Sequence, residues 1–95
     1  MSLVHAVVAY DVVDDARRNR LCRLLKTRLE HVQKSVFEGE VPERALLRLK
    51  AAISRIIDAE QDTVRIYRLC GRCVPMTEIL GCGTWVEPPD EDVFV

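Results

Sequence analysis

A continuous apolar run, Leu3–Tyr10, constrains the fold of this chain more than any other feature, and it ends at Asp11. The run is rich in valine and too short for a typical helix, so it predicts a β-strand. Because its apolar residues do not alternate with polar ones, we expect this strand to be a central one. With 95 residues and a hydrophobic content of 48%, the chain forms one small domain, residues 1–95, with a packed core.

Two segments carry apolar residues at helical spacing. The leucines from Leu21 to Leu29 predict a helix from about Asp15 to about Leu29. A second helix is predicted from about Pro42 to Ile57, because proline is favoured in the first turn of a helix. The apolar positions of this second segment form one stripe that faces a core: Leu46, Leu49, Ile53, Ile56 and Ile57.

Extended structure is predicted between and after these helices. The segment His31–Val41 contains β-forming residues and is either one bent strand or a tight pair, with Gly39 marking a bulge or bend. Thr63–Leu69 alternates apolar and polar residues, which predicts a half-buried strand. Short strands are also expected at Thr77–Leu80 and at the apolar end Val93–Val95. This order predicts an α+β ferredoxin-like sandwich, in which two helices cover one face of a mainly antiparallel sheet.

The net charge of −1 excludes attraction of nucleic acid by the protein as a whole, but the charges are unevenly distributed. Residues 1–57 contain 11 Lys and Arg against 7 Asp and Glu, whereas residues 58–95 contain 3 against 8. A nucleic-acid site would therefore be a local patch. The apolar run at the start is too short to span a membrane and lacks the features of a signal peptide, so we expect a cytoplasmic protein with no membrane partner.

Asp11 is the strongest candidate for chemistry, because a carboxylate at the end of a central strand is held rigidly at the edge of a sheet. Its oxygen atoms suit Mg²⁺ or Mn²⁺. One carboxylate binds such an ion poorly, and a symmetric dimer would bring two copies together. The alternative is an aspartate that only accepts hydrogen bonds from backbone N–H groups at a helix start. Asp14 and Asp15 are interpreted as helix-start residues of that kind.

Arg17, Arg18 and Arg20 lie on the helix that follows Asp11 and are candidates for nucleic-acid binding, because guanidinium groups form bidentate contacts with phosphate. The alternative is a solvated helix face, which charged runs usually form. A stripe of arginines on the later helix is a weaker candidate and is interpreted as solvated: Arg44, Arg48 and Arg55.

Three cysteines in the last third of the chain, Cys70, Cys73 and Cys82, include a C-x-x-C motif. A structural zinc site needs four ligands at ordered spacing, and His5 and His31 are distant in sequence. A redox C-x-x-C motif usually opens a helix, whereas this motif follows a predicted strand. The pattern therefore favours neither zinc nor redox chemistry, and a cytoplasmic chain is expected to keep these thiols reduced.

Four stretches, Ala9–Asp15, Gln33–Glu38, Arg65–Cys70 and Asp92–Val95, occur in an order and at a spacing that together resemble the CRISPR-associated protein 2 family. The first contains a strand that ends in an aspartate and is followed by an arginine-rich helix. The next two are similar to the second and third strands of the family. The resemblance covers nearly the whole chain and implies a ferredoxin-like homodimer.

The resemblance also implies a role in CRISPR adaptation, the capture of new spacers, beside a larger integrase subunit. It implies an Mg²⁺-dependent endonuclease that acts on RNA or double-stranded DNA, with Asp11 as catalytic residue and metal ligand. Tyr10, Ser35 and Phe37 would be neighbours of that site, although phenylalanine is more often a core residue. Since some members serve as inactive scaffolds, the alternative is a non-catalytic dimeric DNA-binding protein that recruits the integrase.

Two further expectations concern the oligomeric state and a possible function outside this family. The small core and the apolar end of the tail, residues 87–95, predict a homodimer in which the tail pairs with the partner subunit. Outside the family, a ferredoxin-like fold is also compatible with a small-ligand regulatory domain, because this fold hosts many functions. The arginine cluster favours a nucleic-acid function over that alternative.

Overall fold

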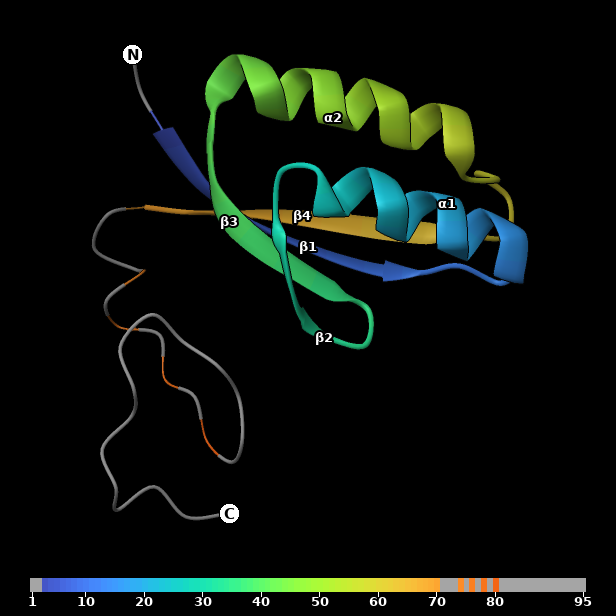
Figure 1. Ribbon diagram of the computed structural model, residues 1–95, viewed down its shortest axis with the longest axis horizontal. Coiled ribbons are helices and arrows are strands. Elements are labelled where there is room, and N and C mark those ends of the chain that lie inside the picture. Colours follow the sequence, from blue (N-terminus) through green and yellow to red (C-terminus); the bar gives the residue numbers. More distant parts are fainter. Residues whose placement is uncertain (1–2, 71–73, 75, 77, 79, 81–95) are drawn as a thin grey trace.

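The computed structural model describes residues 3–70 together with residues 74, 76, 78 and 80 (Figure 1). The predicted tail 87–95, with its expected strand, lies outside the described residues, as do Thr77 and Ile79 of the expected strand before it. Among the described residues, no helix combines the length and apolar character needed to cross a membrane. In chain order the elements are β1 (Leu3–Asp11), α1 (Asp15–Lys26), β2 (Glu30–Gln33), β3 (Val36–Pro42), α2 (Glu43–Ile56) and β4 (Thr63–Leu69).

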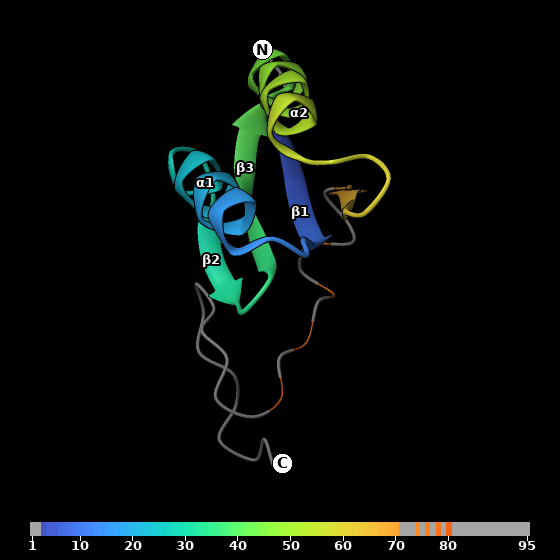
Figure 2. The same ribbon diagram turned by 90° about the vertical axis from the view of Figure 1, so that its right-hand side faces the viewer.

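The strands form one antiparallel sheet in the order β2-β3-β1-β4, so β1 is a central strand with a partner on each side. Both helices lie side by side on the same face of this sheet (Figure 2). Helix α1 begins at the Asp11 end of β1, and α2 runs back toward that end from Pro42, which pairs with Leu3. The predicted ferredoxin-like α+β sandwich is therefore confirmed.

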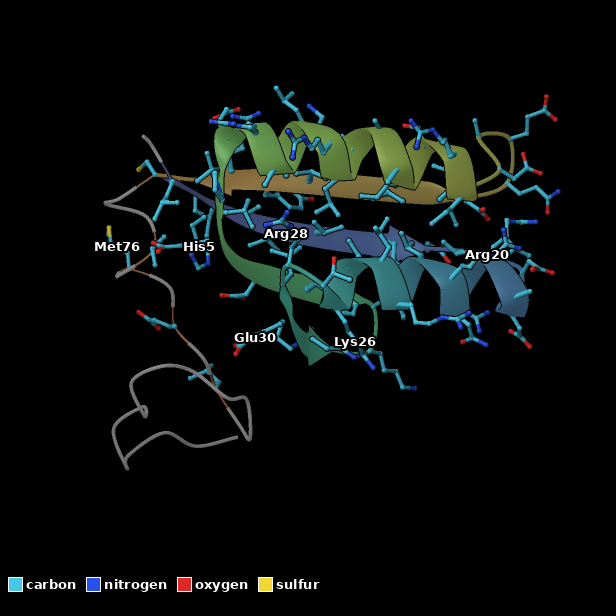
Figure 3. The ribbon with its side chains drawn as sticks, turned by 45° about the horizontal axis from the view of Figure 1, so that its top comes forward. His5, Arg20, Lys26, Arg28, Glu30 and Met76 are labelled. Carbon is cyan, nitrogen blue, oxygen red and sulfur yellow. The ribbon has the colours of Figure 1, made fainter. Side chains whose placement is uncertain are left out.

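The core fills the space between the sheet and the helices, where the side chains of Figure 3 meet. Ala6, Val8 and Tyr10 of β1 point into it and are at most 6% exposed. Val7 and Ala9, which alternate with them, point to the face that no helix covers and are only half-buried. Within one chain, the apolar strand β1 is thus covered on one face only.

The segment predicted as either one bent strand or a tight pair is a hairpin of β2 and β3. Its β-bulge lies between His31 and Gln33, so the prediction of a bulge at Gly39 is wrong. Gly39 pairs in regular register with Ala6, and a Cβ atom there would lie 3.3 Å from Cδ2 of Leu29. The glycine therefore accommodates the close approach of Leu29 to the sheet.

The helix ends differ slightly from the predicted ones. Helix α1 ends at Lys26 rather than Leu29, because the chain turns at Thr27, whose hydroxyl donates to the carbonyl of Leu24 at 2.6 Å. At the other end, Asp14 is the N-cap and accepts a hydrogen bond from the Arg17 N–H at 2.9 Å. Asp14 is therefore a helix-start residue, as predicted.

Candidate nucleic-acid and metal site at the Asp11 end of the sheet

Asp11 is the last residue of β1 and pairs with Thr63, the first residue of β4. Its neighbours Tyr10 and Val12 are buried, whereas Asp11 is exposed and belongs to the open face of the sheet. Among the described residues, its carboxylate forms no hydrogen bond or ion pair. The capping role that was the alternative for Asp11 is performed by Asp14. The Asp11 carboxylate is therefore available to a ligand.

The chemistry of the donor set allows a divalent ion at Asp11 only with additional ligands. The described part of the chain contains no group of three or more His, Cys, Asp and Glu side chains that would hold a metal ion. A carboxylate is a suitable ligand for Mg²⁺ or Mn²⁺, but these ions take about six oxygen ligands. The described part of one chain therefore does not by itself supply a complete ligand set for such an ion.

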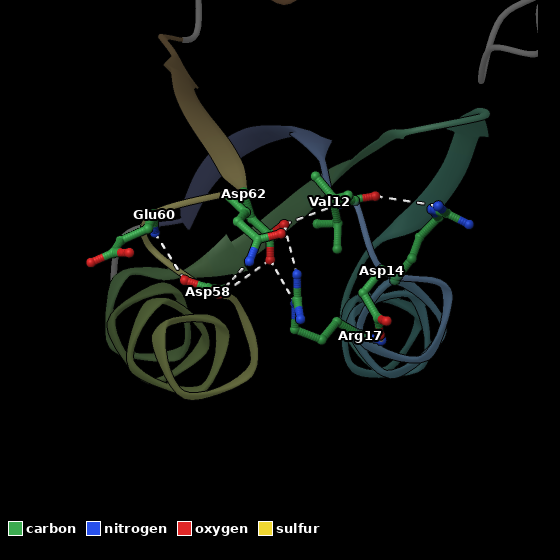
Figure 4. Close-up of polar contacts among 9 residues, drawn as sticks. Val12, Asp14, Arg17, Asp58, Glu60 and Asp62 are labelled. Atoms are coloured by element: carbon green, nitrogen blue, oxygen red, sulfur yellow. Dashed lines mark hydrogen bonds and ion pairs between the residues drawn. The ribbon is translucent and has the colours of Figure 1, made fainter.

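Arg17 is held by Asp62, the residue immediately before β4, whose side chain is fully buried. The guanidinium donates to the two carboxylate oxygens of Asp62, from Nε at 2.8 Å and from Nη2 at 3.3 Å. The backbone N–H groups of Val13 and Asp58 donate to the same carboxylate at 3.0 and 2.8 Å (Figure 4). Asp62 thus connects the start of α1, the β1–α1 loop and the end of α2.

These contacts perturb the ionisation of both partners. The hydrogen bond from Arg17, followed by that from the Asp58 N–H, holds the pKa of Asp62 well below its ordinary value. The same hydrogen bond raises the pKa of Arg17. Sequence reasoning did not identify Asp62, since an aspartate in a polar turn gives no local sign that it will be buried. Its position directly before an alternating strand was the one available signal.

The structure separates the three predicted phosphate contacts. Arg18 donates from Nη1 to Asp15 at 2.6 Å and from Nη2 to the Val12 carbonyl at 3.3 Å, and its side chain stays partly exposed. Arg20 is exposed and forms no ion pair with the described residues. Binding of phosphate by these residues stays a prediction, and the geometry favours Arg20, then Arg18, over the engaged Arg17.

Two of the three predicted site neighbours, Tyr10 and Phe37, point to the core side of the sheet and not to the open face that carries Asp11. Phe37 is fully buried and stacks against His31, with ring centroids 4.3 Å apart, and against Tyr10 at 6.2 Å. The Tyr10 hydroxyl donates to the Lys34 carbonyl at 3.2 Å, and burial raises its pKa. The carbonyl of Ser35 accepts the Tyr10 N–H at 3.0 Å. Through these contacts Phe37, Lys34 and Ser35 hold Tyr10, the neighbour of Asp11, in place.

The cysteines give no sign of a metal centre in the part of the chain that is described. Cys22 is half-buried, and its sulfur lies 2.9 Å from the Tyr10 hydroxyl oxygen. Cys70 is exposed just after β4. Cys73 and Cys82 lie outside the described residues.

Comparison with known proteins agrees with this geometry. Residues 4–77 match the family described as CRISPR associated protein Cas2. The CRISPR-associated endonuclease Cas2 2 of Thermus thermophilus is 46% identical over 76 residues, which are 80% of each chain. The CRISPR-associated endoribonuclease Cas2 of Thermococcus kodakarensis is 42% identical over 91 residues, which are 96% of this chain and 100% of that relative.

Solved structures give the same result. A hypothetical protein from Thermus thermophilus has a TM-score of 0.80 and 42% identity, over 88% of this chain and 98% of its own. A chain in a partial Cas6-RT-Cas1–Cas2 complex has a TM-score of 0.69 and 29% identity, over 80% of this chain and 89% of its own. Fold and site together define a small ferredoxin-like protein with an acidic strand end beside an arginine-rich helix. The chain belongs to the CRISPR-associated protein Cas2 family, as its sequence motifs predicted.

Proposed function

We propose that this chain is a CRISPR adaptation protein that acts as a homodimer and hydrolyses phosphodiester bonds of RNA or double-stranded DNA with a divalent metal ion at Asp11. The observation that carries this proposal is the exposed Asp11 carboxylate, which has no partner among the described residues and ends a central strand. Similar Cas2 proteins are named endonuclease and endoribonuclease. A rigidly held carboxylate is what a metal-dependent nuclease needs.

The homodimer is supported by the open face of the sheet. Val7 pairs with Tyr67 of β4 and Ala9 pairs with Val36 of β3, so these apolar side chains lie at the centre of this face beside the charged Glu38 and Arg65. Tyr67 is 48% exposed in the single chain. Apolar side chains left exposed on an uncovered sheet face favour association. Asp11 belongs to the same face, so a two-fold pairing of these faces with its axis close to the Asp11 end of β1 would bring two Asp11 carboxylates toward each other.

Each side chain then has a distinct part in the proposed reaction. The two Asp11 carboxylates bind Mg²⁺ or Mn²⁺, and Arg20, with Arg18, holds the phosphate backbone of the substrate. When bound, the ion supplies positive charge near the scissile phosphate and lowers the pKa of a coordinated water. The Arg17–Asp62 pair keeps the β1–α1 loop in place, so it acts on the site through Val13 rather than by contact with substrate.

A second candidate function is a non-catalytic dimeric scaffold that binds duplex DNA and recruits the CRISPR integrase. It is favoured by the absence, among the described residues, of a cluster of titratable metal ligands beside Asp11 that would assist hydrolysis. It is also favoured by the similarity to a chain in a complex that contains Cas1. The two functions share the dimer and the arginines and differ only in the need for Asp11.

Cleavage of RNA and of duplex DNA with Mg²⁺ or Mn²⁺ by wild type and Asp11→Asn tests the proposal. Asp11→Asn keeps the shape of the side chain but removes its charge, so cleavage should be lost while the dimer and duplex affinity persist. Glu60→Gln, an exposed carboxylate in the α2–β4 loop, is the matched control and should cleave normally. Equal cleavage by Asp11→Asn and wild type would refute the nuclease site, and wild type that binds but cleaves nothing supports the scaffold.

A further inference from the structure

The positively charged side chains of this protein are concentrated on the helical layer. The two spans 16–28 and 44–55, which cover most of α1 and α2, contain ten of the 14 Lys and Arg residues and none of the 15 Asp and Glu residues. Each helix has one acidic residue, Asp15 in α1 and Glu43 in α2, at its first position, and the other described acidic residues lie outside the two helices. A protein of net charge −1 therefore has a strongly cationic helical side.

Most of these cations have no ion-pair partner in the part of the chain that the structure describes. Arg17 and Arg18 are engaged with Asp62 and Asp15, but the other eight are exposed and form no ion pair with the described residues. Figure 3 places the labelled Arg20, Lys26 and Arg28 at separate points along α1 and the turn after it. These eight exposed cations are Arg20, Arg23, Lys26, Arg28, Arg44, Arg48, Lys50 and Arg55.

Helix α2 carries its own line of these cations, on a different element from Asp11. Arg44, Arg48 and Arg55 are at positions i, i+4 and i+11, which share one side of a helix. The opposite side holds the buried Leu46, Leu49 and Ile53, so the arginines face outward from the sheet. Nitrogen-tipped side chains project from that outer side in Figure 3. We call Arg44, Arg48 and Arg55 the α2 track.

The α2 track extends the cationic surface along most of the length of α2. At a rise of about 1.5 Å per residue, it spans about 16 Å. It begins beside Pro42, which pairs with Leu3, and it ends near the loop that leads to Thr63, which pairs with Asp11. A line of guanidinium groups of this length matches several successive phosphates of a nucleic-acid strand, which advance by about 3.4 Å along the axis.

We propose that the α2 track binds the phosphate backbone of a nucleic-acid duplex, as a second line of contact beside α1. This inference rests on the proposed function, since it assigns more of the surface to the same ligand. The chemistry favours a polyanion over a protein partner: Leu47 is the one large apolar side chain exposed on α2, whereas protein interfaces are centred on apolar and aromatic anchors. Unpaired like charges repel, and bound phosphates neutralise this repulsion. Binding also releases the counterions condensed on the nucleic acid, which favours it further.

The test measures the affinity of the full chain for a DNA duplex of about 30 base pairs at several salt concentrations. For Arg44→Gln/Arg48→Gln/Arg55→Gln we expect the slope of log affinity against log salt to fall by about 2 to 3 units per bound subunit. The same positions changed to lysine keep the charge and should retain most of the slope. The melting temperature should not fall, because the arginines are exposed and have no partners among the described residues.

A matched pair of variants controls for net charge. Arg44→Gln/Arg48→Gln and Lys34→Gln/Lys50→Gln remove the same charge from exposed positions, but only the first pair lies on the α2 track, so only it should reduce the slope strongly. An unchanged slope in the triple variant, or equal slopes in the two pairs, overturns the inference and leaves Asp11-dependent cleavage untouched. If wild type cleaves no substrate but its salt slope depends on the α2 track, the proposed nuclease activity is refuted and the proposed role of the α2 track is supported.

Discussion

The Arg17 guanidinium and the Asp62 carboxylate join the first turn of α1 to the residue that precedes β4, across 45 positions of sequence. Asp11 lies between the two segments that this pair connects, since it precedes the β1–α1 loop and pairs with Thr63. The Val13 N–H adds a third connection to the same carboxylate. The buried side chain of Asp62 thus links the loop after β1 and the start of α1 to the residue that precedes β4, and these links hold the end of β1 in place.

Asp62→Asn should reduce stability in a pH-dependent manner. Because the folded pKa of Asp62 lies below its ordinary value of 3.8, its stabilisation is fully present above about pH 5 and is lost as the pH falls toward the folded pKa. The variant should melt about 10 °C lower at pH 7, and its stability should vary less between about pH 5 and pH 2. Thermal unfolding at several pH values measures both effects. Glu60→Gln should retain the wild-type pH dependence, and an identical profile for Asp62→Asn would exclude Asp62 as the acid-sensitive group.

Arg17→Gln and Arg20→Gln should have different effects, although the two arginines share a helix. Arg17→Gln leaves the buried Asp62 carboxylate without its guanidinium, so the melting temperature should fall while the salt slope of duplex binding changes little. Arg20→Gln removes an exposed charge, so it should reduce the slope by about one unit per subunit without affecting melting. Binding titrations and thermal melts on both variants check this. The reverse pattern would show that Arg17 contacts phosphate.

Val7→Glu should separate the proposed homodimer into monomers. The new carboxylate would lie at the centre of the open face and directly opposite Glu38, its partner on β3, so pairing of two faces would bury unpaired charge. Light scattering should give the monomer mass, and circular dichroism should show an intact fold. Leu47→Glu, on the exposed side of α2, is the control and should remain dimeric. A stable Val7→Glu dimer would place the interface elsewhere.

Phe37→Ala should be among the most destabilising single substitutions. Phe37 is fully buried between the sheet and the helices and stacks on Tyr10 and His31, so its removal leaves a large cavity. The expected loss is about 3 to 5 kcal/mol in the free energy of unfolding, measured by urea denaturation. Tyr67→Ala, which removes a 48% exposed aromatic ring, should change the stability of the monomer by less than about 1 kcal/mol.

The order and type of the described elements could be predicted from the sequence, because local patterns determine them. The alternation in Thr63–Leu69 and the apolar stripe of α2 appear in the structure as predicted. The hairpin of β2 and β3 could not be distinguished from a bent strand, since both have the same composition. The tight packing at Gly39 was not visible either, because it arises from a contact with Leu29, which lies between α1 and β2.

Only those site residues whose role follows from their position along the chain could be predicted. Asp11 was identified because it directly follows an apolar strand, and its exposure agrees with that prediction. The three arginines looked equivalent in sequence, and only the fold shows that Arg17 meets Asp62. The apolar sequence of β1 also does not reveal whether the second face of this strand is covered by the same chain or by another copy. Such differences depend on contacts between distant segments.

The central position of β1 has a consequence for synthesis on the ribosome. This strand emerges before the other described strands, yet one of its neighbours is β4, the last of them, so that His5 pairs with Leu69. A nascent chain that ends before Thr63 therefore exposes one edge of an apolar strand with unpaired N–H and C=O groups, which is a template for aggregation. The sheet closes only when nearly all of the described segment has been made. Truncated products of this gene should for that reason be insoluble rather than partly active.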